Sequence, residues 1–364
     1  MKVALIGYAQ SGKKTMFALL SGHPPQAARR EGEVPEAMSR IYDPRVDALS
    51  KICKPERTKY AENNIALCPD IPSESGGHDW LDAARRCDLL CCVVRGFTST
   101  EVYHPSGSVD VARDRANIET ELMLADLELV EKRLERLGKE KRNGLSPAQA
   151  VEEKALVRCK EILESSRWLN AGGIEPHELA AIKSLGFVTL LPVLWACNVD
   201  ETELAIQRER KANEFYVSAR IEQEIMTIDD PAERREYLKG IGQECTGLER
   251  MNQAAYDTMG LMSFYTIGPD EVRAWTIRKG TCAPAAGGKV HSDIERGFIR
   301  VEIIKYDDLV TAGGQGSQHH AVRRRLRASR QHEVLRVRAV DRDLEDDRFP
   351  VALGPIASRA RGTP

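Results

Sequence analysis

One feature limits the fold of this 364-residue chain more than any other, the segment Gly7-Tyr8-Ala9-Gln10-Ser11-Gly12-Lys13. It has the spacing G-x-x-x-x-G-K, follows the apolar run 3–6 and precedes a helical pattern over 13–20. Glycines at these positions let backbone N–H groups point toward phosphate oxygens, and the lysine reaches the β and γ phosphates. The segment therefore predicts a phosphate-binding loop between a strand and a helix. A chance glycine-lysine turn is the alternative.

The residue after Lys13 departs from the usual form of this loop. A hydroxyl that holds Mg²⁺ normally stands there, but this chain has Lys14, and its hydroxyl comes one position later at Thr15. Because a helix turns by about 100° per residue, Thr15 should not point where its predecessor does. The change weakens the expectation of Mg²⁺ as a cofactor, and it places an ammonium near the metal position.

Three further apolar runs predict buried strands, at 65–68, 89–94 and 188–197. Near-continuous apolar strands separated by helical segments indicate a parallel sheet covered on both faces, so the expected fold class is α/β. Asp70 follows the first of these runs and is the candidate metal ligand of such folds. An aspartate at this place is also a common loop or cap residue. Asn198 follows the third run.

The segment Asn198-Val199-Asp200-Glu201 stands where P-loop GTPases carry the base-reading motif Asn-Lys-x-Asp. In that motif the aspartate binds guanine and the lysine stem lies along the base. Val199 removes the stem and Glu201 moves the carboxylate outward, so guanine selectivity should be lost. Ser218 and Ala219 follow a short strand-like segment and are candidates to complete the base pocket. The alternative is a helix N-cap, since Asn-x-x-Glu is a common capping pattern.

A long helical segment interrupts the α/β pattern after about residue 117. Apolar residues recur there at spacings of three and four, with glutamate four residues before lysine. A turn at Asn143-Gly144 and a second helical pattern over 147–168 predict an antiparallel helical hairpin. Its apolar stripe favours packing within the protein over a binding face for a partner. From about Ser263, alternating runs such as 272–277 predict a small α+β module.

Composition excludes several classes of protein. The net charge is -2, with 42% hydrophobic and 30% charged residues, which is ordinary for a globular protein. No apolar run reaches membrane-spanning length, so we expect no membrane partner. The nine cysteines form no Cys-x-x-Cys pair, which predicts free thiols in a reducing, cytoplasmic location. Seven arginines between 323 and 338 fit a solvated tail or an RNA contact equally well. We expect no reader of DNA sequence.

Several of these segments together resemble the Obg-like ATPase family, also called YchF. The likeness covers most of residues 1–327. The matching segments are Asp43-Pro44-Arg45, Val93-Val94-Arg95, 118–128, 130–135, Asn198–Glu201, 271–277, 279–281, His291 and 295–300.

The resemblance implies a P-loop NTPase domain split by a helical hairpin and followed by a TGS domain, a ubiquitin-like α+β fold. It also implies that the ligand is ATP or another purine nucleotide, with ATP preferred over GTP. Hydrolysis to ADP and phosphate and association with ribosomes or RNA are implied as well. His104 falls where the family carries its catalytic histidine, although it also fits an ordinary loop histidine. The implied boundaries are 1–116 and 185–262 for the nucleotide domain, 117–184 for the hairpin, 263–345 for the TGS domain and 346–364 for a disordered tail.

Four departures from the family surround this site. Lys14 replaces the magnesium-binding serine, residues 27–31 lack the switch-one threonine, Pro72-Ser73 replaces an Ala-Gly pair, and the tail after Arg327 is divergent. Loss of both hydroxyls should reduce turnover strongly. Two hypotheses follow: a working ATPase, and a catalytically impaired pseudo-NTPase that serves as a ribosome- or RNA-binding module.

Overall fold

The four apolar runs become strands of a six-stranded sheet in the order β2-β4-β1-β5-β6-β7. Strands β4, β1, β5, β6 and β7 are parallel, and β2 lies at the edge beside β4. All seven residues of β5 are buried, as expected for a central strand covered on both faces. The strands are β1 (Lys2–Ile6), β2 (Glu36–Ile41), β4 (Ala61–Leu67), β5 (Leu89–Arg95), β6 (Val193–Asn198) and β7 (Glu214–Val217).

Helices follow most of these strands. The strand order reverses at β1, since β4 lies on one side of it and β5, the next strand of this sheet along the chain, lies on the other. The carboxyl end of β1 is therefore the place where an open α/β sheet binds its ligand. The helices are α1 (Lys13–Ser21), α3 (Val111–Glu140), α4 (Pro147–Glu164), α5 (Pro176–Ile182), α6 (Glu201–Leu204), α7 (Ala219–Met226), α8 (Pro231–Gly240) and α9 (Gly247–Thr258).

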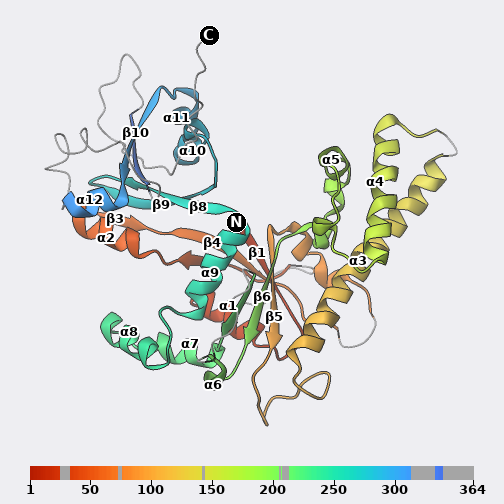
Figure 1. Ribbon diagram of the computed structural model, residues 1–364, viewed down its shortest axis with the longest axis horizontal. Coiled ribbons are helices and arrows are strands. Elements are labelled where there is room, and N and C mark those ends of the chain that lie inside the picture. Colours follow the sequence, from red (N-terminus) through yellow and green to blue (C-terminus); the bar gives the residue numbers. More distant parts are fainter. Residues whose placement is uncertain are drawn as a thin grey trace. The chain divides into compact units, whose positions relative to one another are not determined.

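Helices α3 and α4 lie side by side and run antiparallel (Figure 1). Asp110 caps α3 through the N–H of Arg113, and Ser146 begins α4 with a capping box to Gln149. The faces in contact bury residues such as Val130, Leu137, Leu156 and Cys159. Ion pairs at the rim, Arg133–Glu152 and Lys160–Glu131, set the register of the two helices.

The strand expected at 188–197 is shorter than its apolar run. Residues Val188–Leu190 form a 3₁₀ turn, and β6 begins only at Val193. Pro192 has no N–H to donate to a neighbouring strand. The N–H groups of Val188 and Thr189 instead bind the carboxylate of Asp126, at 3.2 and 2.8 Å. The expectation of a strand over 188–192 was therefore wrong.

By its contacts the chain divides into two compact units. The first comprises Met1–Ser39 and Asn63–Thr258, and the second comprises Arg40–Glu62 and the chain from Met259 onward. The segment Arg40–Glu62 thus groups with the C-terminal part, because β3 (Arg57–Lys59) pairs with β9 (Glu271–Arg278). Tyr265 also donates a hydrogen bond to Asp43.

The second unit holds a three-stranded sheet in the order β3-β9-β8 and an antiparallel pair, β10 with β11. Trp275 on β9 stacks on Phe264 of β8 inside this unit, and Phe264 is fully buried. Its remaining elements are β8 (Leu261–Ile267), β10 (Arg300–Lys305), β11 (Glu333–Arg338), α2 (Pro44–Cys53), α10 (Ala283–Val290), α11 (Ser292–Arg296) and α12 (Tyr306–Ala312).

The structure describes residues 1–24, 33–72, 76–141, 144–204, 206, 213–312 and 333–338. The switch-one segment 27–31, Asn143, most of the arginine-rich stretch and the tail 346–364 lie outside these residues. Within the described chain, no helix is both long and apolar enough to cross a bilayer.

Candidate phosphate-binding site

The loop between β1 and α1 depends on two glycines. Gly7 has φ +156°, and a Cβ there would lie 2.5 Å from the backbone oxygen of Val93. Gly12 has φ +92°, and a Cβ there would lie 2.2 Å from Nδ2 of Asn198. Close approach by neighbouring groups therefore requires glycine at both positions.

Lys13 begins α1, and its side chain is only 2% exposed. Its Nζ donates to the carbonyl oxygens of Gly7, Cys68 and Pro69, at 3.2, 2.9 and 2.8 Å. It also forms an ion pair with Asp70 at 3.0 Å. Burial lowers the pKa of Lys13, and the neighbouring carboxylate of Asp70 opposes that shift. The ammonium of Lys13 is thus held beside the loop by four oxygen atoms.

Asn198 joins this loop to a segment more than twenty residues further along the chain. Its Nδ2 donates to the carbonyl of Ser11 at 3.0 Å, and its Oδ1 accepts from the N–H of Ala219 at 3.0 Å. Asn198 and Ser218 are each 4% exposed, and Ala219 is 6% exposed. The structure therefore brings together three of the segments singled out from the sequence.

Other candidates lie outside this group of contacts. Val199 is buried, and its side chain packs against Gly96, which follows β5. A Cβ added to Gly96 would lie only 2.9 Å from Cγ1 of Val199. Glu201 is exposed in the first turn of α6. Lys14 is exposed in the first turn of α1, and Thr15 is partly exposed.

One carboxylate of the described residues, that of Asp70, lies at this loop as a possible metal ligand. Mg²⁺ takes oxygen ligands in a near-octahedral arrangement. At this loop Asp70 offers one carboxylate, whose Oδ1 is held by Lys13, and Lys14 stands where a hydroxyl is needed. No group of three or more His, Cys, Asp or Glu side chains suited to a metal occurs in the described part of the chain.

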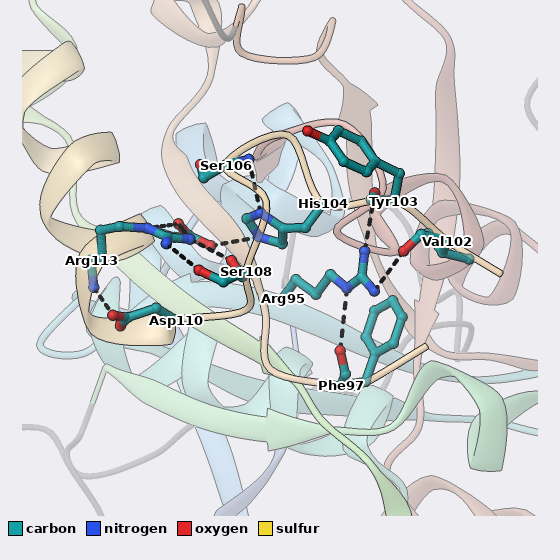
Figure 2. A network of polar contacts seen from close by, with 10 residues as sticks. Arg95, Phe97, Val102, Tyr103, His104, Ser106, Ser108, Asp110 and Arg113 are labelled. Atoms are coloured by element: carbon teal, nitrogen blue, oxygen red, sulfur yellow. Dashed lines mark hydrogen bonds and ion pairs between the residues drawn. The ribbon is translucent and has the colours of Figure 1, made fainter. Parts of the chain in front are cut away.

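His104 is held in the loop after β5 by both of its ring nitrogens (Figure 2). Nδ1 accepts from the N–H of Ser106 at 3.1 Å, and Nε2 lies 2.9 Å from Oδ2 of Asp114. The proton of the neutral ring is therefore on Nε2, where it is donated to Asp114. Arg113 binds the other oxygen of Asp114, and the His104 side chain is 5% exposed. In this arrangement the ring has no nitrogen left to orient water.

Arg95 fixes the first half of the same loop (Figure 2). Its guanidinium donates to the carbonyls of Phe97, Val102 and Tyr103, and it lies 4.4 Å from the centre of the Phe97 ring. Burial lowers the pKa of Arg95, and Asp200 opposes that shift. The loop is thus anchored at both ends by charged side chains.

Comparison with known proteins identifies the family of this chain. The ribosome-binding ATPase YchF of Haemophilus influenzae is 34% identical over 348 residues, which cover 89% of this chain and 94% of that protein. The chain belongs to the YchF family. Ribosome-binding ATPase YchF of Bacillus subtilis is 32% identical, with 90% and 94% covered. The YchF GTPase structure from Schizosaccharomyces pombe superposes with a TM-score of 0.74 at 26% identity, covering 93% and 97% of the two chains. A family model described as "YchF-GTPase_C: Protein of unknown function (DUF933)" matches residues 261–335.

Four residues around the loop of this YchF-family chain were not among the candidates expected from the sequence. Arg95 had a visible signal, a charge that ends an otherwise apolar strand. Asp114 had a weaker one, an acid in the first turn of a helix, and Asp200, which accepts from Thr98, had none. Ser11 is 2% exposed, and its Oγ has no hydrogen-bond partner among the described residues.

The first turns of α3 lie near the phosphate loop. Burial raises the pKa of Tyr8, the carboxylates of Glu121 and Asp114 raise it further, and Arg113 lowers it. These charges act on a side chain of the loop, so the groups that hold His104 also lie within electrostatic reach of it.

Proposed function

We propose that this chain binds ATP in preference to GTP at the loop Gly7–Lys13 and associates with ribosomes. One observation carries the nucleotide part: Asn198 ties the loop to Ala219 through two buried hydrogen bonds. A ligand that lies across Asn198 contacts a phosphate-binding loop on one side and a base-binding segment on the other. A nucleoside triphosphate has that length and that chemistry.

The base segment favours adenine over guanine. The side chain of Val199 packs near Gly96, so no aliphatic stem lies along the base from this position. Asp200 is engaged by the N–H and hydroxyl of Thr98, both at 2.9 Å. Glu201 is then the carboxylate available near the base, and it sits on an exposed helix turn that does not fix the guanine geometry.

Association with ribosomes rests on the family. The Haemophilus, Escherichia and Bacillus relatives carry the name ribosome-binding ATPase. We propose further that residues 117–184 are the inserted hairpin of this family and that residues 263–345 contain its TGS domain. Pairing of β3 with β9 supports adding Arg40–Glu62 to that C-terminal unit.

Two catalytic states compete for this chain. In the first, bound ATP is hydrolysed to ADP and phosphate, with His104 as the catalytic residue. In the second, the protein is an impaired NTPase that binds ATP and does not turn it over. Two observations favour the second: Lys14 replaces a magnesium-binding hydroxyl, and both ring nitrogens of His104 are engaged within the chain.

The residues present define what binding requires. Lys13 must release the carbonyls of Gly7, Cys68 and Pro69 for its ammonium to reach phosphate oxygens. Asp70 pairs with that ammonium at 3.0 Å and opposes the lowering of its pKa by burial. We propose Lys14 as a second cation for the phosphates, which would replace part of the charge that Mg²⁺ supplies in related proteins. Asp70 remains the candidate metal ligand if a metal binds at all.

Calorimetric titration of ATP and GTP, with and without EDTA, tests this proposal. We expect ATP to bind more tightly than GTP and its affinity to change little when EDTA is added. Phosphate release, measured on the same protein, distinguishes the two catalytic states. Release abolished by His104→Ala supports the hydrolase, and absence of release supports the impaired form. Failure to bind either nucleotide would contradict the whole proposal.

Ribosome association has a separate test. The full chain is sedimented with ribosomes at increasing salt. Contacts with RNA phosphates release counterions, so binding should weaken steeply as salt rises. Absence of co-sedimentation at low salt would contradict the ribosomal part of the proposal and leave the nucleotide part standing.

A further inference from the structure

The exposed face of β2 continues into an aromatic cluster in the second unit. Along β2 the residues alternate, so Ser39 and Ile41 are buried while Arg40 is exposed. Tyr42 follows in the same alternation and is 51% exposed. About half of the surface of Tyr42 is therefore accessible on the second unit.

Tyr42 is stacked on a second ring. The centroids of Tyr42 and Tyr60 lie 6.3 Å apart with an angle of 28° between the ring planes. The guanidinium of Arg40 lies 5.6 Å from the centre of the Tyr60 ring. We call Arg40, Tyr42 and Tyr60 the Tyr42 stack. It places a cation over one ring and that ring against a second, and a flat base can stack on such aromatic rings.

A hydrogen bond fixes the position of the Tyr60 ring beside Tyr42. Its hydroxyl donates a hydrogen bond to Oδ1 of Asp47 on α2. Burial raises the pKa of Tyr60, and this carboxylate raises it further, so the phenol keeps its proton and the hydrogen bond. The lower ring of the stack is therefore preorganised, and the cost of ordering it on binding a ligand is small.

The surroundings of the stack are basic. Residues 40–62 contain six basic and four acidic side chains, although the whole chain has a net charge of -2. Two of those acids are engaged locally, because Asp43 binds Arg45 and Asp47 binds Tyr60. Arg57 and Lys59 are exposed on β3, directly before Tyr60, and Lys59 forms an ion pair with Glu271 at 2.7 Å. Positive charge beside a stacking surface is complementary to a polyanion that carries flat bases.

We infer that the Tyr42 stack binds single-stranded RNA, with an unpaired base stacked on Tyr42 and the neighbouring arginine and lysine side chains facing the phosphates. Single-stranded nucleic acid is bound in this way, by aromatic platforms that tolerate any base and by cations that follow the backbone. The inference deepens the proposed ribosome association, on which it rests for its biological setting. An acidic peptide would match the charge but would not use the exposed ring.

Fluorescence anisotropy of a labelled single-stranded oligoadenylate, titrated with the full-length chain, tests the inference. We expect binding that weakens with salt, and a loss of about tenfold in affinity for Tyr42→Ala. Tyr42→Trp should keep or strengthen binding, which separates loss of stacking from a folding defect. Arg40→Ala should weaken binding and reduce its salt dependence. Tyr103→Ala is the matched control, since Tyr103 is a 73% exposed tyrosine of the first unit.

Each outcome decides the matter. Loss of affinity in Tyr42→Ala but not in Tyr103→Ala supports the inference, as does weaker binding to an abasic phosphodiester of equal length. Absence of oligoadenylate binding, equal affinity of Tyr42→Ala and the unaltered chain, or equal displacement by polyglutamate at matched charge overturns it. Ribosome sedimentation of the same variants is read separately. Tyr42-dependent RNA binding without ribosome association would remove the ribosomal proposal and leave the RNA surface standing.

Discussion

At the scale of single residues, Asn198 is the group that holds the candidate site together. Its buried amide satisfies the carbonyl of Ser11 and the N–H of Ala219, two backbone groups from distant segments. Asn198→Ala leaves both without their partner, so we expect a loss of about 2 kcal/mol or more in the free energy of unfolding, together with weaker ATP binding.

Urea denaturation and calorimetry of the same variant measure these two effects. Asn198→Asp is the informative companion, because its carboxylate still accepts from Ala219 but repels the carbonyl of Ser11. It should be at least as unstable as the alanine variant. Unchanged stability in both variants would show that the two hydrogen bonds of Asn198 contribute nothing to the free energy of unfolding.

Glu222 gives a residue-scale prediction about pH. Burial raises its pKa to about 7 from an ordinary 4.5, while its Oε1 accepts the N–H of Gly247 at 2.6 Å. The folded chain holds this proton more tightly than the unfolded chain, so its stabilising effect is present below pH 4.5 and is lost as pH rises through 7. The loss is roughly 3 kcal/mol. Glu222→Gln copies the protonated form. At pH 5 the variant and the unaltered chain should unfold at the same urea concentration, and at pH 8 the variant should need a higher concentration than the unaltered chain.

At the scale of elements, the start of α3 controls the loop that carries His104. Asp114 accepts from Nε2 of His104 and from Arg113, so it needs two acceptor oxygens. The asparagine of Asp114→Asn has only one acceptor oxygen. Whichever partner that oxygen binds, the amide NH2 group then faces the N–H donor of the other partner. We expect amide hydrogen exchange at Ser106 and Gly107 to become roughly tenfold faster.

The matched control is Glu101→Gln, an exposed carboxyl in the same loop. It should leave exchange at Ser106 unchanged, and β5 should stay protected in both variants. Faster exchange throughout β5 in Asp114→Asn would indicate general unfolding and would contradict a local anchor.

The elements also show which parts of the fold the sequence could predict. Strands at 65–68 and 89–94 and the helix from Lys13 are confirmed, because their signal is a local apolar pattern. The shortened β6 could not be foreseen, since it depends on Asp126 capturing two backbone N–H groups from another element. The anchoring of His104 was missed for the same reason. Its partners are fixed only when the loop folds against α3.

At the scale of the whole molecule, the balance of charge at the phosphate loop sets how the chain responds to nucleotide. Lys13 and Lys14 place two ammonium groups at the start of α1, where the helix dipole also favours anions. P-loop NTPases in general receive part of that positive charge from Mg²⁺. A chain that carries the charge covalently should be stabilised by ATP without metal.

Thermal unfolding of the full chain measures this property directly. At a hundredfold excess over its dissociation constant, a ligand of the folded state adds about 2.7 kcal/mol of stability. We expect ATP in EDTA to raise the midpoint of the unaltered chain, and Lys14→Ala to lose most of that rise. Lys14→Ser should lose it in EDTA and recover it when Mg²⁺ is added, because the hydroxyl returns to the position that holds the metal. If Lys14→Ser gains nothing from Mg²⁺, the lysine is not the reason for metal independence. The missing oxygen ligands beyond it, with Asp70 held by Lys13, would then account for the loss.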